Sequence, residues 1–121
     1  NPSIAPNVSI YNTSSNIRQR WTITYSSEKD AYKLLNKDEN DNFKALAWNS
    51  NVDDTVFGYA SIDCDDHYWR FEPVGNGNYI IKNYVNPKKV LDLKYLSSSS
   101  IDVHMNDRTN SITQQFKIVS F

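Results

Sequence analysis

Three aromatic residues at nearly equal intervals constrain the fold of this chain. Trp69 follows Trp21 by 48 residues, and Phe116 follows Trp69 by 47 residues. Each aromatic begins a short stretch in which apolar and polar residues alternate, which is typical of a half-buried strand. A self-similar period of this length indicates a repeat architecture, in which equivalent units share one core. We therefore expect three repeated units, each with a strand at its aromatic anchor and with the anchors in the core.

Other strands are predicted at matching places around the anchors. Tyr32 and Tyr79, which are 47 residues apart, begin the predicted first strands of two units. Residues 26–35 offer a candidate helix cap, but their alternation fits a strand that follows a turn. Clusters of Asn, Asp, Ser and Gly separate the strands and favour tight turns. The second strands are predicted at 45–48 and 90–93, and the third strands at 8–11, 56–59 and 101–104.

Three four-stranded units with three-fold internal symmetry describe an all-β fold, the β-trefoil, which is a short barrel closed at one end by hairpins. We expect a single domain over residues 1–121, with units at approximately 1–25, 26–73 and 74–121. Three units of about 47 residues need roughly 140 residues, and the chain has 121. The first unit shows a third and a fourth strand but no first or second strand before Asn7. We therefore expect a first repeat that is incomplete at the N-terminus, in a domain that belongs to a longer chain or receives the hairpin from another chain.

The charge and cysteine content exclude several classes of function. The net charge is −1 and the isoelectric point is near 6.1, so the chain lacks the basic surface that nucleic acids and anionic membranes require. No apolar run has the length of a membrane span. Cys64 is the only cysteine, so an internal disulfide is excluded. We expect neither a nucleic-acid partner nor membrane insertion.

Residues 63–67 contain every common type of metal ligand, yet we predict no metal site and no cofactor. In extended chain, neighbouring side chains point in opposite directions and do not converge on one ion. Nucleophilic catalysis requires a base beside the nucleophile. His67 and His104 are the only histidines, and neither belongs to a nucleophile motif. The sequence therefore does not predict an enzyme.

The repeated motifs resemble those of the ricin-B-type lectins. The resemblance rests on Gln-X-aromatic triplets at Gln19 and Gln114 and on the Leu-Asp-Leu strand around Asp92. A closer resemblance, to the C-terminal trefoil of the haemagglutinin lectins associated with clostridial neurotoxins, covers residues 19–25, 28–32, 83–87 and 90–93. The resemblance implies a non-enzymatic trefoil that binds galactose-containing glycans. Sugar binding suits such residues, because a carboxylate accepts hydrogen bonds from two hydroxyls and an aromatic ring stacks on the apolar face of the sugar.

The resemblance places one sugar site in the third unit. Asp92 matches the family's sugar-binding carboxylate, and His104 stands where the family usually has a stacking Tyr or Phe. Gln114 matches the triplet Gln, whereas Thr113 replaces an Asn that normally helps to hold the sugar. The other candidate contacts are Tyr95, Asn106, Asp107 and Asn110.

The other units lack parts of this site. In the second unit, Ala47 replaces the carboxylate and His67 replaces the triplet Gln, so Tyr59 alone is not expected to hold a sugar. Structural roles stay open for these residues. Asp92 could be a turn residue that bonds nearby backbone amides, and His104 could be a partly exposed strand residue without a ligand. The side chains of Gln19 and Gln114 could bond the backbone within their own units.

We expect a secreted lectin module that attaches a toxin or haemagglutinin assembly to galactose-containing glycans on cells, with other subunits of that assembly as partners. A protein-docking trefoil with a degenerate sugar site is an alternative, favoured by the departures at His104 and Thr113. A further alternative is the receptor-binding domain of an insecticidal pore-forming toxin.

Overall fold

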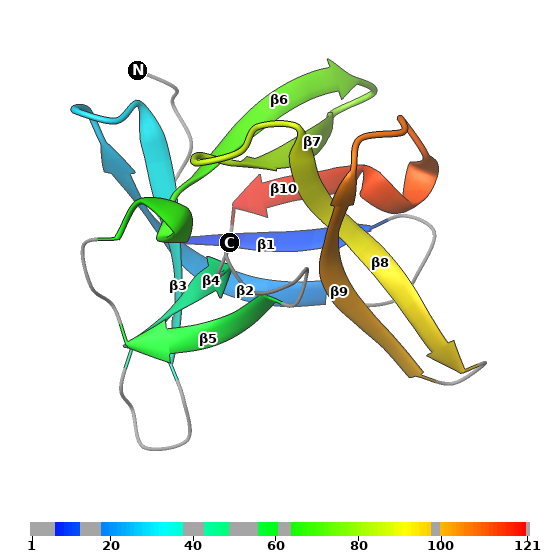
Figure 1. Ribbon diagram of the computed structural model, residues 1–121, viewed down its shortest axis with the longest axis horizontal. Helices are drawn as coiled ribbons and strands as arrows, with labels where there is room; N and C mark the ends of the chain where they lie inside the picture. Colours follow the sequence, from blue (N-terminus) through cyan, green and yellow to red (C-terminus); the bar gives the residue numbers. More distant parts are fainter. Residues whose placement is uncertain are drawn as a thin grey trace.

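Short strands form nearly all the regular structure of this chain (Figure 1). The computed structural model describes residues 7–12, 18–37, 43–48, 56–60, 64–97 and 100–120. Within these ranges there are two single-turn 3₁₀ helices and no α-helix, and no helix has the length and apolar character needed to cross a membrane. The elements are β1 (Asn7–Asn12), β2 (Arg18–Ser26), β3 (Ala31–Lys37), β4 (Phe43–Trp48), β5 (Val56–Ala60), η1 (Asp65–His67), β6 (Trp69–Gly75), β7 (Asn78–Asn83), β8 (Lys89–Ser97), β9 (Ser100–Asp107), η2 (Ile112–Gln114) and β10 (Phe116–Ser120).

Six of the strands close into a barrel. The antiparallel neighbours run in the order β1, β2, β3, β6, β7, β10 and back to β1. Figure 1 shows the closing pair, with β1 and β10 side by side through the centre of the view. Closure removes the exposed sheet edges that would otherwise pair with other chains. In each unit the aromatic anchor pairs with an early residue of the first barrel strand: Trp21 with Val8, Trp69 with Tyr32, and Phe116 with Tyr79.

This register corrects the predicted place of residues 8–11. They were expected to form the third strand of the first unit, but β1 pairs with both β2 and β10 and so occupies the barrel position of a first strand. Two buried amides support this equivalence. Asn83 in β7 donates from Nδ2 to the carbonyl of Asp66 in η1, and Asn12 in β1 donates to the carbonyls of Ile112 and Gln115 at η2.

The first unit differs from the others in the connection between its two barrel strands. β1 and β2 are joined by residues 13–17, five residues in all, whereas 31 residues join β3 to β6 and 32 join β7 to β10. The long connections contain the hairpins β4–β5 and β8–β9. A five-residue connection is too short for such a hairpin, so the strands absent from the first unit are the second and third.

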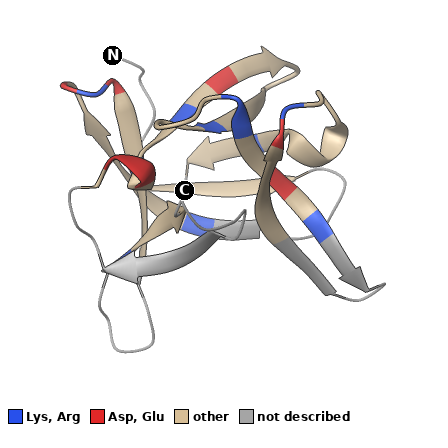
Figure 2. Ribbon diagram, in the orientation of Figure 1, with Lys and Arg blue, Asp and Glu red and all other residues tan. Residues whose placement is uncertain are grey.

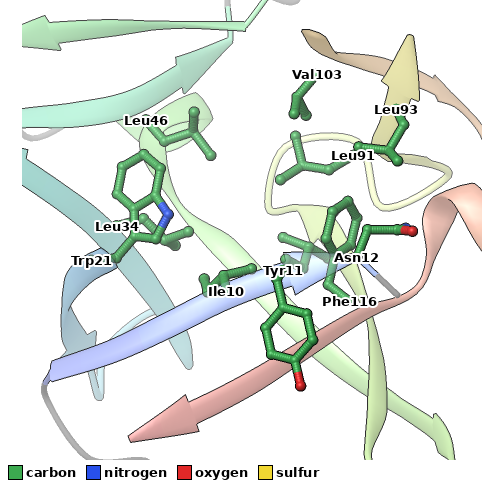
Figure 3. A pocket seen from close by; sticks show the side chains of 11 residues that line it. Ile10, Tyr11, Asn12, Trp21, Leu34, Leu46, Leu91, Leu93, Val103 and Phe116 are labelled. Atoms are coloured by element: carbon green, nitrogen blue, oxygen red, sulfur yellow. The ribbon is translucent and has the colours of Figure 1, made fainter. Parts of the chain in front are cut away.

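A cavity of about 60 Å³ lies among these elements, with an almost wholly apolar lining (Figure 3). The hairpins of the second and third units contribute Leu46 from β4 and Leu91 and Leu93 from β8, while β1 and β2 contribute Ile10 and Trp21. Figure 3 shows Leu46 and Trp21 on one side of the opening and Leu91 and Val103 on the other. The cavity is therefore bordered by the two hairpins and by the unit that has none.

The core prediction is confirmed for Trp69 and Phe116, which expose 0% and 5% of their surface. Trp21 is only half-buried and packs against the edge of the core. Its partial exposure follows from its place on the cavity wall, in the unit without a hairpin. The prediction of strand rather than helix for residues 26–35 is also confirmed, since β2 ends at Ser26 and a turn leads into β3.

Candidate functional site

The candidate site lies where η2 packs against the hairpin β8–β9. Asp92 stands opposite His104 in the register of this hairpin. Leu91 and Leu93 flank Asp92 and belong to the core cluster. Because neighbouring side chains of a strand alternate, Asp92 faces away from these leucines and toward Gln114 of η2. Only 6% of Asp92 is exposed.

One oxygen of the Asp92 carboxylate is held by two side-chain amides. Oδ2 accepts hydrogen bonds from Asn106 Nδ2 at 3.0 Å and from Gln114 Nε2 at 3.2 Å. Gln114 is itself fixed, because its Nε2 also donates to the Asp107 carbonyl at 2.8 Å and its Oε1 accepts from the Thr109 backbone N–H at 2.9 Å. Gln114 is completely buried. The network therefore orients the carboxylate from within the fold.

The other carboxylate oxygen, Oδ1, is buried and accepts no hydrogen bond from the described residues. Burial raises the pKa of Asp92, but Thr113, Asn106, Gln114 and the nearby His104 lower it by more, so the pKa lies below its ordinary value. The Thr113 hydroxyl pairs with the Ser111 hydroxyl at 3.0 Å. At neutral pH the site therefore holds an ionised carboxylate with one unbonded oxygen.

The structure brings Asp92, His104, Asn106 and Gln114 together, but two other candidate side chains turn elsewhere. Asp107 is exposed and pairs with Lys89 at 3.3 Å, so that only its backbone joins the network. The Asn110 side chain accepts from Arg108 Nε at 3.1 Å. Tyr95 belongs to β8, and its side chain lies outside the described part of the structure.

An ion-pair cluster beside the site escaped sequence reasoning. Arg108, just after β9, makes a two-pronged contact with Glu72 of β6, and Lys82 of β7 donates to the same carboxylate at 3.1 Å. Hydrogen bonds from Arg108 and Lys82 lower the pKa of Glu72 to about 2. Glu72 and Arg108 are 36 residues apart in sequence, and no local pattern connects them. The cluster anchors the end of the β8–β9 hairpin to the barrel.

The second unit has the same strand arrangement without the carboxylate. Ala47 occupies the position of Asp92 and is completely buried. The residue opposite Ala47 is Phe57, so Phe57, and not the expected Tyr59, corresponds to His104. His67 in η1 corresponds to Gln114 in η2 and is likewise buried.

The predicted divergence of the side chains in residues 63–67 is wrong. Residues 65–67 form η1, a 3₁₀ turn, and the turn brings donor atoms of Cys64, Asp66 and His67 within 4.8 Å of one another. The expectation rested on extended chain, in which adjacent side chains alternate. A 3₁₀ turn has about three residues per turn, so residues three apart lie on the same side.

Comparison with known proteins assigns the family. Residues 17–106 match the Ricin-type beta-trefoil lectin domain-like family. The chain belongs to this family, whose domains are carbohydrate-binding modules. The β-trefoil prediction is thereby confirmed.

The relatives include toxins and haemagglutinins. The chain is 31% identical over 111 residues to the main hemagglutinin component type C of Clostridium botulinum C phage, a match that covers 91% of this chain and 36% of that protein. It is 29% identical over 100 residues to pierisin of Pieris brassicae, covering 78% of this chain and 12% of pierisin. Among solved structures, a mosquitocidal holotoxin matches with a TM-score of 0.81 and 25% identity, over 95% of this chain and 17% of that chain.

The chain thus spans about a third of the haemagglutinin component and smaller shares of pierisin and the holotoxin. The similarity is to a carbohydrate-binding module found in toxin-related proteins. The expected resemblance to ricin-B-type and haemagglutinin lectins is confirmed at that level.

Proposed function

We propose that this domain is a non-enzymatic, galactose-type lectin module, secreted as part of a toxin or haemagglutinin assembly that it attaches to cell-surface glycans. The family supports carbohydrate binding. The relative named as a hemagglutinin component and the mosquitocidal holotoxin support the assembly. Partners would be galactose-containing glycans and the other subunits of that assembly.

The observation that carries the proposal is the oriented Asp92 carboxylate. Oδ2 is held by Asn106 and Gln114, which leaves Oδ1 for a sugar hydroxyl. A carboxylate accepts hydroxyl hydrogen bonds with charge assistance, and such bonds are stronger than those between neutral groups. Gln114 is completely buried, so it would act as a positioning residue for Asp92.

Access to the carboxylate requires a local rearrangement. Asp92 is 6% exposed, so the side chains around it must shift before a hydroxyl reaches Oδ1. His104 is half-buried directly across the hairpin from Asp92. We propose that its imidazole moves aside and then stacks on the sugar ring. Tyr95, Asp107 and Asn110 are the remaining proposed contacts, the last two only after they leave their partners Lys89 and Arg108. A single site of this kind binds weakly, so firm attachment would need several copies.

A retention assay tests the proposal. The chain should be retained on galactose-agarose and released by free galactose or lactose. Asp92→Ala should abolish retention, while the matched control Asp65→Ala, which removes an exposed carboxylate in the second unit, should leave it unchanged. Equal retention of the Asp92→Ala variant would exclude Asp92 as the sugar contact.

One observation favours a second function, that of a protein-docking trefoil with a degenerate sugar site. Asp92 is nearly inaccessible, and its unbonded oxygen is buried. If docking is the function, the parental chain should show no glycan retention and no chemical-shift changes at His104 on addition of lactose.

The third alternative, a receptor-binding domain of an insecticidal toxin, has support in the likeness to the mosquitocidal holotoxin. Binding to insect midgut glycoproteins that survives their deglycosylation would distinguish it.

A further inference from the structure

The turn before β6 gathers three side chains of metal-binding type. Each of Cys64, Asp66 and His67 offers one donor atom, and the three donors lie within 4.8 Å of one another. The Cys64 Sγ is 3.0 Å from Asp66 Oδ1, and His67 Nε2 is 3.9 Å from the same oxygen. Figure 2 shows η1, which carries Asp66, as an acidic segment of the ribbon.

The backbone beneath this cluster is well fixed. The His67 N–H donates to the Cys64 carbonyl at 3.0 Å, and the Tyr68 N–H donates to the Asp65 carbonyl at 3.1 Å. From β7, the buried Asn83 side chain donates to the Asp66 carbonyl at 3.1 Å. A constellation held in this way by its supporting bonds loses little entropy when it binds an ion.

We propose that Cys64, Asp66 and His67 form a binding site for a Zn²⁺ ion. Thiolate, imidazole and carboxylate are the ligand types that Zn²⁺ takes in proteins. Zinc bonds of about 2.0–2.3 Å with tetrahedral angles place ligand atoms roughly 3.3–3.7 Å apart. The separations from Asp66 Oδ1 to Cys64 Sγ and His67 Nε2, 3.0 and 3.9 Å, lie just below and just above this range. Small side-chain rotations would therefore bring the three donors to tetrahedral positions around the ion. A water molecule fills the fourth position.

Binding is a ligand exchange without oxidation or reduction. The Cys64 thiol gives its proton to the solvent as the zinc–sulfur bond forms, and hydration waters leave the ion. The thiolate and the Asp66 carboxylate then balance the charge of the ion. The nearby Lys29 is engaged with the exposed Asp65 at 2.9 Å. Lys33 is close enough to His67 to act on it electrostatically.

The place of the cluster in the fold gives it a distinct role from the glycan site. η1 occupies in the second unit the position that η2 occupies in the third. In the second unit Ala47 has replaced the sugar-binding carboxylate, and the ligand His67 stands in the position of Gln114. The same turn therefore serves a glycan site in one unit and a metal site in the other.

Cobalt titration of the whole chain, after treatment with a chelator, tests the zinc site. Tetrahedral Co²⁺ bound to one thiolate should give visible d–d bands and a near-ultraviolet sulfur-to-cobalt charge-transfer band that saturate at one ion per chain. Zn²⁺ should then displace the cobalt with the same stoichiometry. A titration without the charge-transfer band would overturn the proposal.

Variants identify the ligands. Cys64→Ser should remove the charge-transfer band and weaken Zn²⁺ binding by about tenfold or more, and His67→Gln should weaken it similarly. The control Asp65→Asn changes an adjacent acidic residue outside the cluster and should bind zinc within about twofold of the parental chain. Cys64 is only partly buried, so Cys64→Ser should keep the parental thermal melt even if the buried His67 variant does not fold. Parental zinc affinity in a folded Cys64→Ser chain would exclude the site, whatever the outcome of the glycan assay.

Discussion

The second and third units share their backbone and differ in their polar side chains. Each contains a hairpin, a 3₁₀ turn and an aromatic anchor that pairs with a first-strand tyrosine. In the third unit a buried amide, Gln114, supports the carboxylate of Asp92. In the second, His67 and Ala47 occupy those two positions. The comparison shows that the anchors maintain the fold while the candidate site is carried by a separate set of residues, so one set can change without the other.

The largest effect should come from truncating the anchors, which the two units share. Trp69→Ala and Phe116→Ala should each lower the free energy of unfolding by about 3–5 kcal/mol, because both side chains are buried in one core. Trp21→Ala should have a smaller effect, since Trp21 is half-buried at the cavity. Urea denaturation measures all three. A Trp21 variant as unstable as the Trp69 variant would contradict the assigned difference between the units.

Transferring the carboxylate to the second unit should destabilise the protein. Ala47→Asp places a charge in a completely buried position without Gln as its donor, and we expect a loss of about 3 kcal/mol. His67→Gln in the same chain should recover part of this loss, with a coupling of about 1 kcal/mol. A double-mutant cycle of the free energies of unfolding, obtained by urea denaturation, measures this coupling. If the effects of the two substitutions on stability simply add, positions 47 and 67 of the second unit are not equivalent to positions 92 and 114 of the third.

Removing the support of Asp92 should have an intermediate effect. Gln114→Ala takes one donor from the buried carboxylate and the acceptor from the Thr109 N–H, which should cost about 1–3 kcal/mol of stability. Glycan retention should weaken as well, because Asp92 is no longer oriented. Chemical denaturation and lactose titration report the two effects. A variant with reduced stability but parental lactose affinity would assign Gln114 to the fold alone.

The smallest effect concerns the ion pair between β6 and the end of β9, and it depends on pH. Arg108 and Lys82 hold the pKa of Glu72 at about 2, below its ordinary value of 4.5. A lowered pKa means that ionised Glu72 stabilises the fold above about pH 4.5, and that this contribution disappears as the pH falls toward 2. Glu72→Gln should therefore be slightly less stable than the parental chain at pH 7 and equally stable near pH 2. Thermal melts from pH 2 to pH 7 give the difference, and a constant gap across that range would refute the assignment.

Alternation and turn residues predicted the strands well, because both are local properties. They did not predict the place of β1. The alternation of apolar and polar residues around Val8 and Ile10 is the same whether the strand lies in the barrel between β2 and β10 or in a hairpin. The spacing of Asp92 and Gln114 suggested their meeting only through a family resemblance, and the structure shows the bond that joins them. The ligand types around Cys64 were recognised in the sequence, but their convergence was not, because a single 3₁₀ turn leaves little trace in a sequence read as extended chain.

The pairing of β1 with β10 has a consequence for how the domain folds. Val8 pairs with Ser120, 112 positions away along the chain, which is the largest sequence separation of any strand pairing among the described residues. Because the entropy of closing a loop grows with its length, the local hairpins should form early and the barrel should close last. Folding of this kind is slow, and a pulling force applied at the two ends would act first on the β1–β10 seam.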